Sequence, residues 1–369
     1  MPTVPDAFAR EVHCLLGLPF DAVDAAGAAA AIREAATHRR RCVLSTPNLN
    51  FLVACLRDEA FRDSVIESDL SIADGMPLVW IARILGIPLP ERVAGSSVFE
   101  RLRREEAGRM SVYFFGGVPG TAETACRRLN ADSPGMRCVG FENPGFGSVE
   151  DMSSDETIAR INASRADFVV VALGARKGQA WIARSRERLS ASVISHLGAV
   201  LNFVAGTVRR APPWMQRSGL EWLWRIREEP ALWGRYLADG MALLRLVATR
   251  VIPHRLFIWR HGPHSSVLAA AAMETSDDGK ERLARLRGAW TAGGLAPLRE
   301  WLAQNVYSRA DVRLDMASVS YVDSAFLGLL LLAYGESKRR GGRLNIGPTS
   351  KNAARVFRYA CAEFLLEPR

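Results

Sequence analysis

The chain has 369 residues, of which 49% are hydrophobic and 24% charged, and it carries a formal net charge of +9 at pH 7. This balance is typical of globular proteins and excludes a disordered chain, and the length is sufficient for two domains with separate cores. The longest apolar run, from Ala325 to Tyr334, is far shorter than the roughly 20 residues that span a bilayer. No signal-peptide pattern begins the chain, so we predict no membrane-spanning segment.

The cysteines and histidines show no ligand pattern. Without a CxxC pair or a regular spacing, we interpret the six cysteines as small buried hydrophobic residues of a reducing cytoplasm, and we expect no disulfide and no zinc framework. No Asp-x-Asp follows a predicted strand, so the sequence predicts no metal site and no cofactor. The cysteines are Cys14, Cys42, Cys55, Cys126, Cys138 and Cys361.

Five short apolar runs predict the strands of a mostly parallel sheet: 41–46, 111–115, 137–141, 167–173 and 191–197. Segments with helical spacing, such as 121–129 and 180–189, separate them. Alternation of strand and helix is typical of an α/β fold with helices on both faces of the sheet. We therefore predict an α/β domain over residues 1–208.

Polar side chains follow the first of these strands. Thr46 and Asn48 flank Pro47, which favours extended backbone before it. Their hydroxyl and amide groups suit contacts with sugar hydroxyls, and one of the two also suits the N-cap of the next helix.

Asp74 and Gly75 follow the apolar segment 70–73, so we place them at a strand end. There a carboxylate is suited to remove the proton from an attacking hydroxyl group. A lone Asp-Gly pair is otherwise typical of a simple turn.

Two further features before residue 121 are suited to anions. Arg92 has the planar fork that binds phosphate through two hydrogen bonds; the alternative is a surface ion pair with Glu91 or another neighbour. Gly116 and Gly117 lie between a strand and a helix, where backbone N–H groups favour a donor nucleotide. They lack the dinucleotide and P-loop spacings, so a plain turn is an equal alternative.

Residues 209–260 form a basic, tryptophan-rich segment that we expect to be a helical appendage. It contains ten arginines, four acidic residues and five of the nine tryptophans. Arginine interleaved with tryptophan and leucine suits an anionic membrane surface. No nucleic-acid-binding motif accompanies the charge, so we predict no nucleic acid partner. A basic helical hairpin packed on its own domain is the alternative interpretation.

A linker is predicted within 261–279, and from about residue 265 the pattern changes. The runs 313–317, 319–324 and 341–346 resemble a STAS domain, the fold of anti-sigma-factor antagonists. We expect Ser324 to cap the helix that follows and Phe326 to offer an exposed apolar contact for a protein partner or self-association. Anti-sigma-factor antagonists typically carry Asp-Ser-Ser-Gly or Asp-Ser-Thr-Gly at this junction and are phosphorylated on the second hydroxyl residue. Here Ala325 stands in place of that residue and Phe326 in place of the glycine, so we expect no switching by serine phosphorylation.

The motifs Thr46-Pro47-Asn48, Ala73-Asp74-Gly75-Met76-Pro77 and Glu91-Arg92-Val93-Ala94-Gly95 together resemble the WecG/TagA/CpsF family, glycosyltransferase family 26. The resemblance extends over residues 10–240. Members transfer a sugar from a nucleotide donor to a lipid-linked acceptor at the inner membrane face. The resemblance implies that Asp74 is the catalytic base, that Thr46 and Asn48 line the active site, and that Arg92 contributes to activity.

Sequence blocks after residue 173 also resemble the family, but several family residues are replaced in them. The resemblance implies that Gln179 and Asn202 contact substrate, although family members carry Glu and Asp there. It also implies that Arg210, Arg225 and Arg235 bind the acceptor's phosphates. Gly178 stands where the family has a functional Gln, and Leu232 where it has another arginine.

We therefore predict inverting transfer from a UDP-sugar to a polyprenyl-diphosphate-linked saccharide, in envelope or extracellular polysaccharide synthesis. The enzyme would lie in the cytoplasm, peripherally on the inner face of the membrane, and work without a metal. The alternative is a catalytically degenerate domain that acts as a STAS-coupled binding scaffold. The replacements at 178, 202 and 232 favour that alternative, and the intact Asp74 and Arg92 oppose it.

Overall fold

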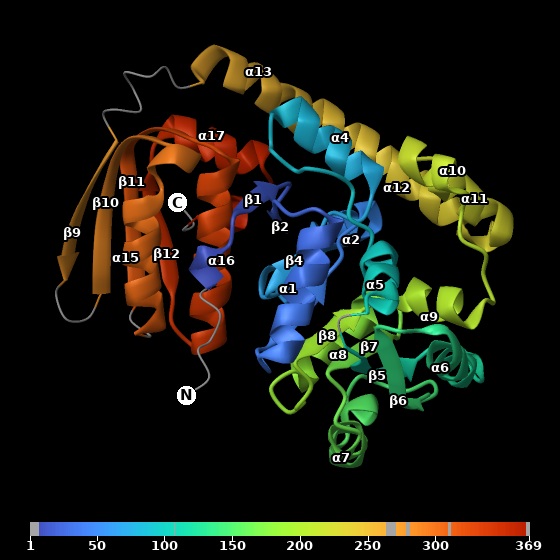
Figure 1. Cartoon of the computed structure of the whole chain (residues 1–369). Helices are drawn as coiled ribbons and strands as arrows, with labels where there is room; N and C mark the ends of the chain where they lie inside the picture. Colours follow the sequence, from blue (N-terminus) through green and yellow to red (C-terminus); the bar gives the residue numbers. More distant parts are fainter. Residues whose placement is uncertain (1–6, 107, 263–270, 278–280, 309–310, 367–369) are drawn as a thin grey trace. The chain divides into compact units, whose positions relative to one another are not determined.

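The computed structural model describes residues 7–106, 108–262, 271–277, 281–308 and 311–366 (Figure 1). The chain forms two compact units. The first consists of Val23–Val79 and Pro90–Gly240, and the second of the described residues up to Ala22, Trp80–Leu89 and the described residues from Met241 onward. The division falls within helices α4 (Met76–Leu85) and α12 (Trp233–Leu246), whereas the domain boundaries predicted near residues 208 and 265 stay predictions.

The first unit is built on a six-stranded sheet in the order β4-β3-β8-β7-β5-β6, and every neighbouring pair is parallel. The predicted α/β fold with a mostly parallel sheet is therefore confirmed. The strands are β3 (Cys42–Ser45), β4 (Leu70–Ser71), β5 (Met110–Gly116), β6 (Met136–Glu142), β7 (Phe168–Ala172) and β8 (Val193–His196).

Helices connect the strands and cover the sheet. They are α1 (Ala25–Thr37), α2 (Leu49–Cys55), α3 (Glu59–Ile66), α5 (Gly95–Arg104), α6 (Thr121–Asp132), α7 (Asp155–Ala163), α8 (Ala175–Ser185), α9 (Gly198–Ala205), α10 (Pro213–Ser218) and α11 (Glu221–Glu228), with the 3₁₀ turns η2 (Asp151–Ser153) and η3 (Pro230–Leu232).

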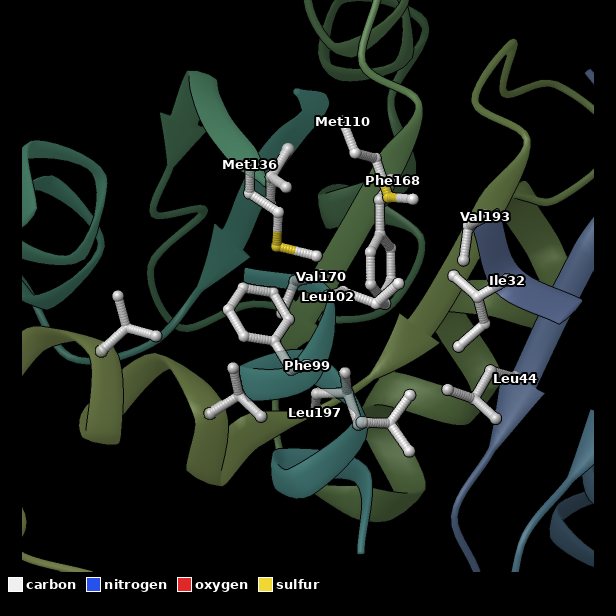
Figure 2. Close-up of a cluster of buried hydrophobic side chains, with 14 of the residues drawn as sticks. Ile32, Leu44, Phe99, Leu102, Met110, Met136, Phe168, Val170, Val193 and Leu197 are labelled. Atoms are coloured by element: carbon white, nitrogen blue, oxygen red, sulfur yellow. The ribbon is translucent and has the colours of Figure 1, made fainter. Parts of the chain in front are cut away.

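The two faces of the sheet have separate cores because successive strand residues point to opposite sides. On β7, Phe168 and Val170 join a cluster with residues of α1, α5, α6 and α9, whereas Val169 and Val171 join one with α7 and α8. In the first cluster Phe99 of α5 lies 6.2 Å from Phe168, ring centre to ring centre (Figure 2). Helices thus bury both faces, which leaves the strand ends for ligands.

The expectation of no disulfide was wrong for one pair of cysteines. Cys126 of α6 and Cys138 of β6 form a disulfide. The two residues are 12 apart in sequence and share no motif, but α6 leads directly back into β6 and brings them together. The other four cysteines are free and buried, as predicted.

The second unit contains a four-stranded sheet in the order β12-β11-β10-β9. Strands β10, β11 and β12 are parallel to one another, and β9 is antiparallel to β10. The described elements of this sheet and its helices are β9 (Ala272–Asp277), β10 (Glu281–Trp290), η5 (Ala292–Gly294), α15 (Ala296–Tyr307), β11 (Asp311–Val322), α16 (Ser324–Arg340), β12 (Leu344–Thr349), α17 (Lys351–Tyr359) and η6 (Glu363–Leu365).

The N-terminal segment also belongs to this second unit. It folds as η1 (Ala7–Ala9) and an antiparallel hairpin of β1 (Val12–Leu15) and β2 (Leu18–Asp21). The hairpin packs on α16: a Cβ added to Gly328 would lie 2.1 Å from the Val12 carbonyl oxygen. Two residues earlier on α16, Phe326 faces Trp290 of β10, with 6.4 Å between ring centres. Two residues correspond to about 200° of a helix, so sheet and hairpin cover opposite sides of α16.

Two predictions for the start of α16 were wrong. The N-cap is Asp323, whose carboxylate accepts a hydrogen bond from the Phe326 N–H at 2.9 Å. Ser324 is instead the first helical residue, and its Oγ lies 3.1 Å from Nδ1 of His13. Phe326 is fully buried, because the third residue of this helix faces the sheet, so it offers no surface for self-association.

We expect Gly328→Ala to loosen the hairpin. Alanine normally strengthens a helix by about 1 kcal/mol relative to glycine, but here its methyl group would meet hairpin backbone that must move. Overpacking of this kind costs about 1–3 kcal/mol, so amides of residues 12–21 should exchange faster with deuterium. Gly293→Ala is the control, since nothing lies within 4 Å of a Cβ there. If Gly328→Ala were more stable than wild type and the hairpin amides exchanged with deuterium at the wild-type rate, the close contact between Gly328 and Val12 would be contradicted.

The segment after α12 is helical up to His261, through the π-helical turn η4 (Val247–Val251) and α13 (Ile252–His261). The linker predicted within 261–279 lies largely outside the described residues, and 272–277 form β9 rather than a linker. Among the described helices, none combines the length and apolar character needed to cross a membrane.

Candidate functional site

Four of the predicted site residues, Thr46, Asn48, Asp74 and Arg92, lie where β3, β4 and α5 meet. The Asp74 N–H donates to the Pro47 carbonyl at 2.9 Å, and the Val93 N–H donates to the Ala73 carbonyl at 3.0 Å. These bonds align the residues that follow β3 with those that follow β4. A Cβ on Gly95 would lie 2.5 Å from Cδ2 of Leu197 and 2.9 Å from Cγ2 of Thr46, so a larger residue here would push these side chains aside. The carboxyl end of the sheet therefore brings Thr46 and Asp74 together with the start of α5.

Asn48 is the N-cap of α2, because its Oδ1 accepts the Phe51 N–H at 3.1 Å. The cap alternative therefore applies to Asn48. Thr46 is buried.

Asp74 lies in an enclosed and charged environment. Burial raises the pKa of its carboxyl group; Arg92 opposes that rise, and the negative charge of Glu221 adds to it. The Gly95 N–H at the start of α5 also hydrogen-bonds to the carboxylate, and a helix N-terminus favours negative charge. The side chain remains 28% exposed. A carboxylate with a raised pKa that solvent still reaches is suited to accept a proton.

Arg92 connects Asp74 to the appendage. Its Nε lies 3.7 Å from Oδ1 of Asp74, its Nη2 donates to Oε2 of Glu221 at 2.6 Å, and its Nη1 donates to the Gln216 carbonyl at 3.1 Å. The alternative was a surface ion pair with Glu91 or another neighbour; the ion pairs that form are with Asp74 and Glu221, and Glu91 accepts the Ala25 N–H at 3.0 Å. Arg92 is thus an enclosed group beside the candidate base.

Of the three arginines predicted to bind acceptor phosphates, two lie near this cluster. Arg210 donates from Nη2 to Oγ of Ser97 at 2.6 Å, and its buried Nε has no hydrogen-bond partner among the described residues. Arg225 lies over the Phe203 ring at 5.8 Å and belongs to the charge environment of Asp74. Arg235 is exposed on α12 and lies over the ring of Tyr236.

A hollow adjoins Arg225 and Glu221. The residues that line it come from α9, the segment after α9, α11 and the residue that caps α11: Phe203, Val208, Arg209, Ala211, Glu221, Trp224, Arg225, Glu228 and Glu229. Its volume of about 10 Å³ is roughly the space that one water molecule needs, so the hollow is far smaller than a substrate pocket.

Gly116 and Gly117 end β5 with positive φ angles of 103° and 88°. The Gly117 N–H donates to the Ala172 carbonyl at 2.8 Å, and its carbonyl accepts a hydrogen bond from Asn143. A Cβ at Gly117 would lie 2.3 Å from Leu201. The Gly117 N–H is therefore used within the fold, and packing alone accounts for glycine at this turn.

Gln179 lies in the core beneath β3. It is 1% exposed, and its Nε2 donates to Oγ of Ser45 at 2.9 Å. A substrate contact by this side chain remains a prediction that the geometry does not favour. Asn202 lies on α9 and is partly exposed.

His196, at the end of β8, occupies the space beside Gly178. A Cβ at Gly178 would lie 2.3 Å from Cδ2 of His196. Burial lowers the pKa of His196 to about 4, so its imidazole is neutral at pH 7. The ring therefore fills the room that a side chain at position 178 would need.

Sequence reasoning missed the roles of Glu221 and Gln216. Both lie more than 120 residues after Arg92, and no local motif signals that they contact it. Within the described residues, no group of three or more His, Cys, Asp or Glu side chains is arranged to hold a metal ion.

Comparison with known proteins adds to this geometry. Residues 13–256 match the sequence profile described as the glycosyl transferase WecG/TagA/CpsF family, and residues 273–366 match that described as Mlab, STAS domain.

Two related proteins share the name N-acetylglucosaminyldiphosphoundecaprenol N-acetyl-beta-D-mannosaminyltransferase. The one from Bacillus spizizenii is 28% identical over 197 residues, which are 53% of this chain and 74% of that protein. The one from Bacillus subtilis is 29% identical over 198 residues, 53% of this chain and 75% of its own length. The structure of the Bacillus cell fate determinant SpoIIAA in the phosphorylated form covers 26% of this chain and 89% of that one, with 18% identity and a TM-score of 0.24.

Proposed function

This chain belongs to the WecG/TagA/CpsF family of glycosyl transferases and carries a STAS domain, and we propose that it transfers a hexosyl group from a UDP-sugar to a polyprenyl-diphosphate-linked saccharide. Both families predicted from the motifs are confirmed. The observation that carries the proposal is the cluster of Asp74, Arg92, Arg210 and Arg225 at the carboxyl end of the sheet.

In the proposed reaction Asp74 accepts the proton of the acceptor's hydroxyl group as its oxygen attacks the anomeric carbon. The bond from that carbon to the diphosphate breaks, UDP leaves, and the configuration inverts. Arg92, Arg210 and Arg225 would neutralise phosphate groups, since guanidinium groups bind phosphate through paired hydrogen bonds. Thr46 and Asn48 would hold sugar hydroxyls at the same strand end. The names of the two relatives support a diphosphate-linked sugar as acceptor.

A UDP-release assay tests this function. The purified full chain is incubated with UDP-N-acetylmannosamine, UDP-N-acetylglucosamine or UDP-glucose and a short polyprenyl-diphosphate-linked N-acetylglucosamine. We expect UDP and an extended lipid-linked product with one of the donors, without added metal. Binding of the UDP-sugar without any transfer would instead support the STAS-coupled scaffold.

We further propose that the chain reaches this acceptor by lying on an anionic membrane surface. Exposed apolar side chains, here called the apolar stripe, recur along α12 and along α13. Within the first unit, Asp239 accepts hydrogen bonds from Asn50, and within the second unit Phe257 contacts Tyr359, so each part of this helical run also has buried residues. The stripe consists of Trp233, Leu237, Met241, Leu244, Ile252, Leu256 and Trp259, each at least half exposed.

Basic side chains accompany the apolar stripe. Arg235, Arg245, Arg255 and Arg260 are exposed on the same helical run. Each basic residue near an anionic surface contributes about 1 kcal/mol, and tryptophan favours the interface between headgroups and hydrocarbon. The combination supports peripheral binding on the leaflet that presents the lipid-linked acceptor.

A further inference from the structure

Arg92 joins the strand end that carries Asp74 to two short helices. Its Nη2 binds Oε2 of Glu221, the first residue of α11, and its Nη1 binds the carbonyl of Gln216 in α10. The Arg92 and Glu221 side chains are only 13% and 19% exposed. Because water screens such an enclosed pair weakly, the contact is stronger than an ordinary surface ion pair. Arg92 thus links α10 and α11 to the strand end that carries the candidate base.

The same guanidinium edge is where a phosphate would bind. Carboxylate and phosphate oxygens accept the same paired N–H groups of an arginine. A phosphate that takes the Nη2 N–H group now bonded to Glu221 must therefore displace Oε2 of that carboxylate. Gln216 offers only a neutral carbonyl and adds no charge to this competition.

The charges around Glu221 favour the exchange. Arg210 and Arg225 accompany Arg92 around Asp74 and Glu221, and Glu100 adds a third carboxylate beside Arg210. The buried Nε of Arg210 has no hydrogen-bond partner within the described part of the chain, and such a donor costs free energy until an acceptor reaches it. A diphosphate brings more negative charge and more acceptor oxygens than the single carboxylate it would replace.

We propose that Glu221 is a gate for diphosphate: it occupies Arg92 and holds α10 and α11 in place, and an incoming diphosphate group displaces it and releases the two helices. The inference rests on the proposed function for the identity of the ligand. It assigns Glu221 a positioning role that acts through Arg92 and not on the reacting atoms. Substrate binding and movement of α10 and α11 are then one event.

The test compares Glu221→Gln with Glu228→Gln in the full chain. Both variants remove one negative charge from α11, but Glu228 is exposed and has no contact with Arg92. Calorimetry measures the binding of inorganic diphosphate, UDP and farnesyl diphosphate. Because Glu221→Gln removes the charged competitor for Arg92, it should bind diphosphate at least about tenfold more tightly than Glu228→Gln.

Hydrogen exchange gives a second measurement. Diphosphate should speed exchange of the amides of residues 213–228 in the wild-type protein. In Glu221→Gln that exchange should be fast already and change little when diphosphate is added. A gain in affinity confined to UDP would assign the gate to the donor, and a gain confined to farnesyl diphosphate would assign it to the acceptor.

Weaker diphosphate binding by Glu221→Gln would overturn the gate, because Glu221 would then orient Arg92 for the ligand. Affinities equal to those of Glu228→Gln would also overturn it. Melting temperatures check that each variant is folded, and Glu221→Asp, which keeps the charge on a shorter side chain, should fall between wild type and Glu221→Gln. If the protein transfers no sugar but Glu221→Gln still binds diphosphate more tightly than Glu228→Gln, the proposed function is wrong and the gate stands.

Discussion

Asp74→Asn is expected to lower turnover by roughly 10²–10⁴-fold, the usual contribution of a general base. The amide has nearly the same shape and its oxygen still accepts the Gly95 N–H, but it does not take a proton from the acceptor. Wild-type turnover should rise with pH through a pKa above that of an ordinary aspartate, because burial and Glu221 raise the pKa of Asp74. The variant should lose this rise.

The stability of Asp74→Asn separates chemistry from folding. A carboxyl group whose folded pKa is raised destabilises the fold once pH exceeds its unfolded pKa, because the charged form is disfavoured there. Asparagine removes this effect, so the variant should be at least as stable as wild type at pH 7. Asp58→Asn is the control: Asp58 caps α3 through the Phe61 N–H at 3.1 Å, and asparagine caps equally well. Near-normal turnover of Asp74→Asn would exclude Asp74 as the base.

Replacement of Leu237, Leu244 and Leu256 by glutamate should abolish binding to anionic vesicles. These side chains are 55%, 65% and 56% exposed, so the fold should tolerate the change. Each leucine that enters an apolar layer contributes about 1.5–3 kcal/mol, and three carboxylates would add repulsion. Sedimentation with vesicles containing phosphatidylglycerol, at low and high salt, measures the loss.

The matched control carries three glutamates on other exposed apolar residues, Leu56, Val118 and Phe146, at 39%, 67% and 103% exposure. It changes charge and surface hydrophobicity to the same extent but leaves the apolar stripe intact. We expect it to bind vesicles nearly as well as wild type. Equal loss in both triple variants would mean that net charge, and not the stripe, governs binding.

The local sequence was sufficient for the strands and for the polar residues that follow them. Apolar runs such as 167–173 have few alternatives to a buried strand, and parallel strands bring their carboxyl ends to one edge. Placing Thr46, Asn48 and Asp74 at that edge therefore needed only the order of the elements. What the sequence could not supply was how distant segments meet there.

Glu221 illustrates this limit, since its contact with Arg92 depends on how α10 and α11 fold back over the sheet. The Cys126–Cys138 disulfide likewise depends on the register of α6 against β6. The sequence patterns around Ser324 and Phe326 gave the right helix with its start one residue late. In the structure the cap is Asp323, one residue earlier than predicted, and Phe326 faces the sheet and is buried.

The hairpin of β1 and β2 has a consequence for the order in which the protein is made. Its contact helix α16 ends at Arg340, more than 300 residues after the hairpin. At the usual rate of synthesis, about 5–20 residues per second, the hairpin waits on the order of tens of seconds for its helix to leave the ribosome. Leu15, Leu16 and Phe20 are almost wholly buried in the folded protein, so they must be shielded from solvent until the helix is available. A nascent chain that stops before α16 would therefore be a client for chaperones.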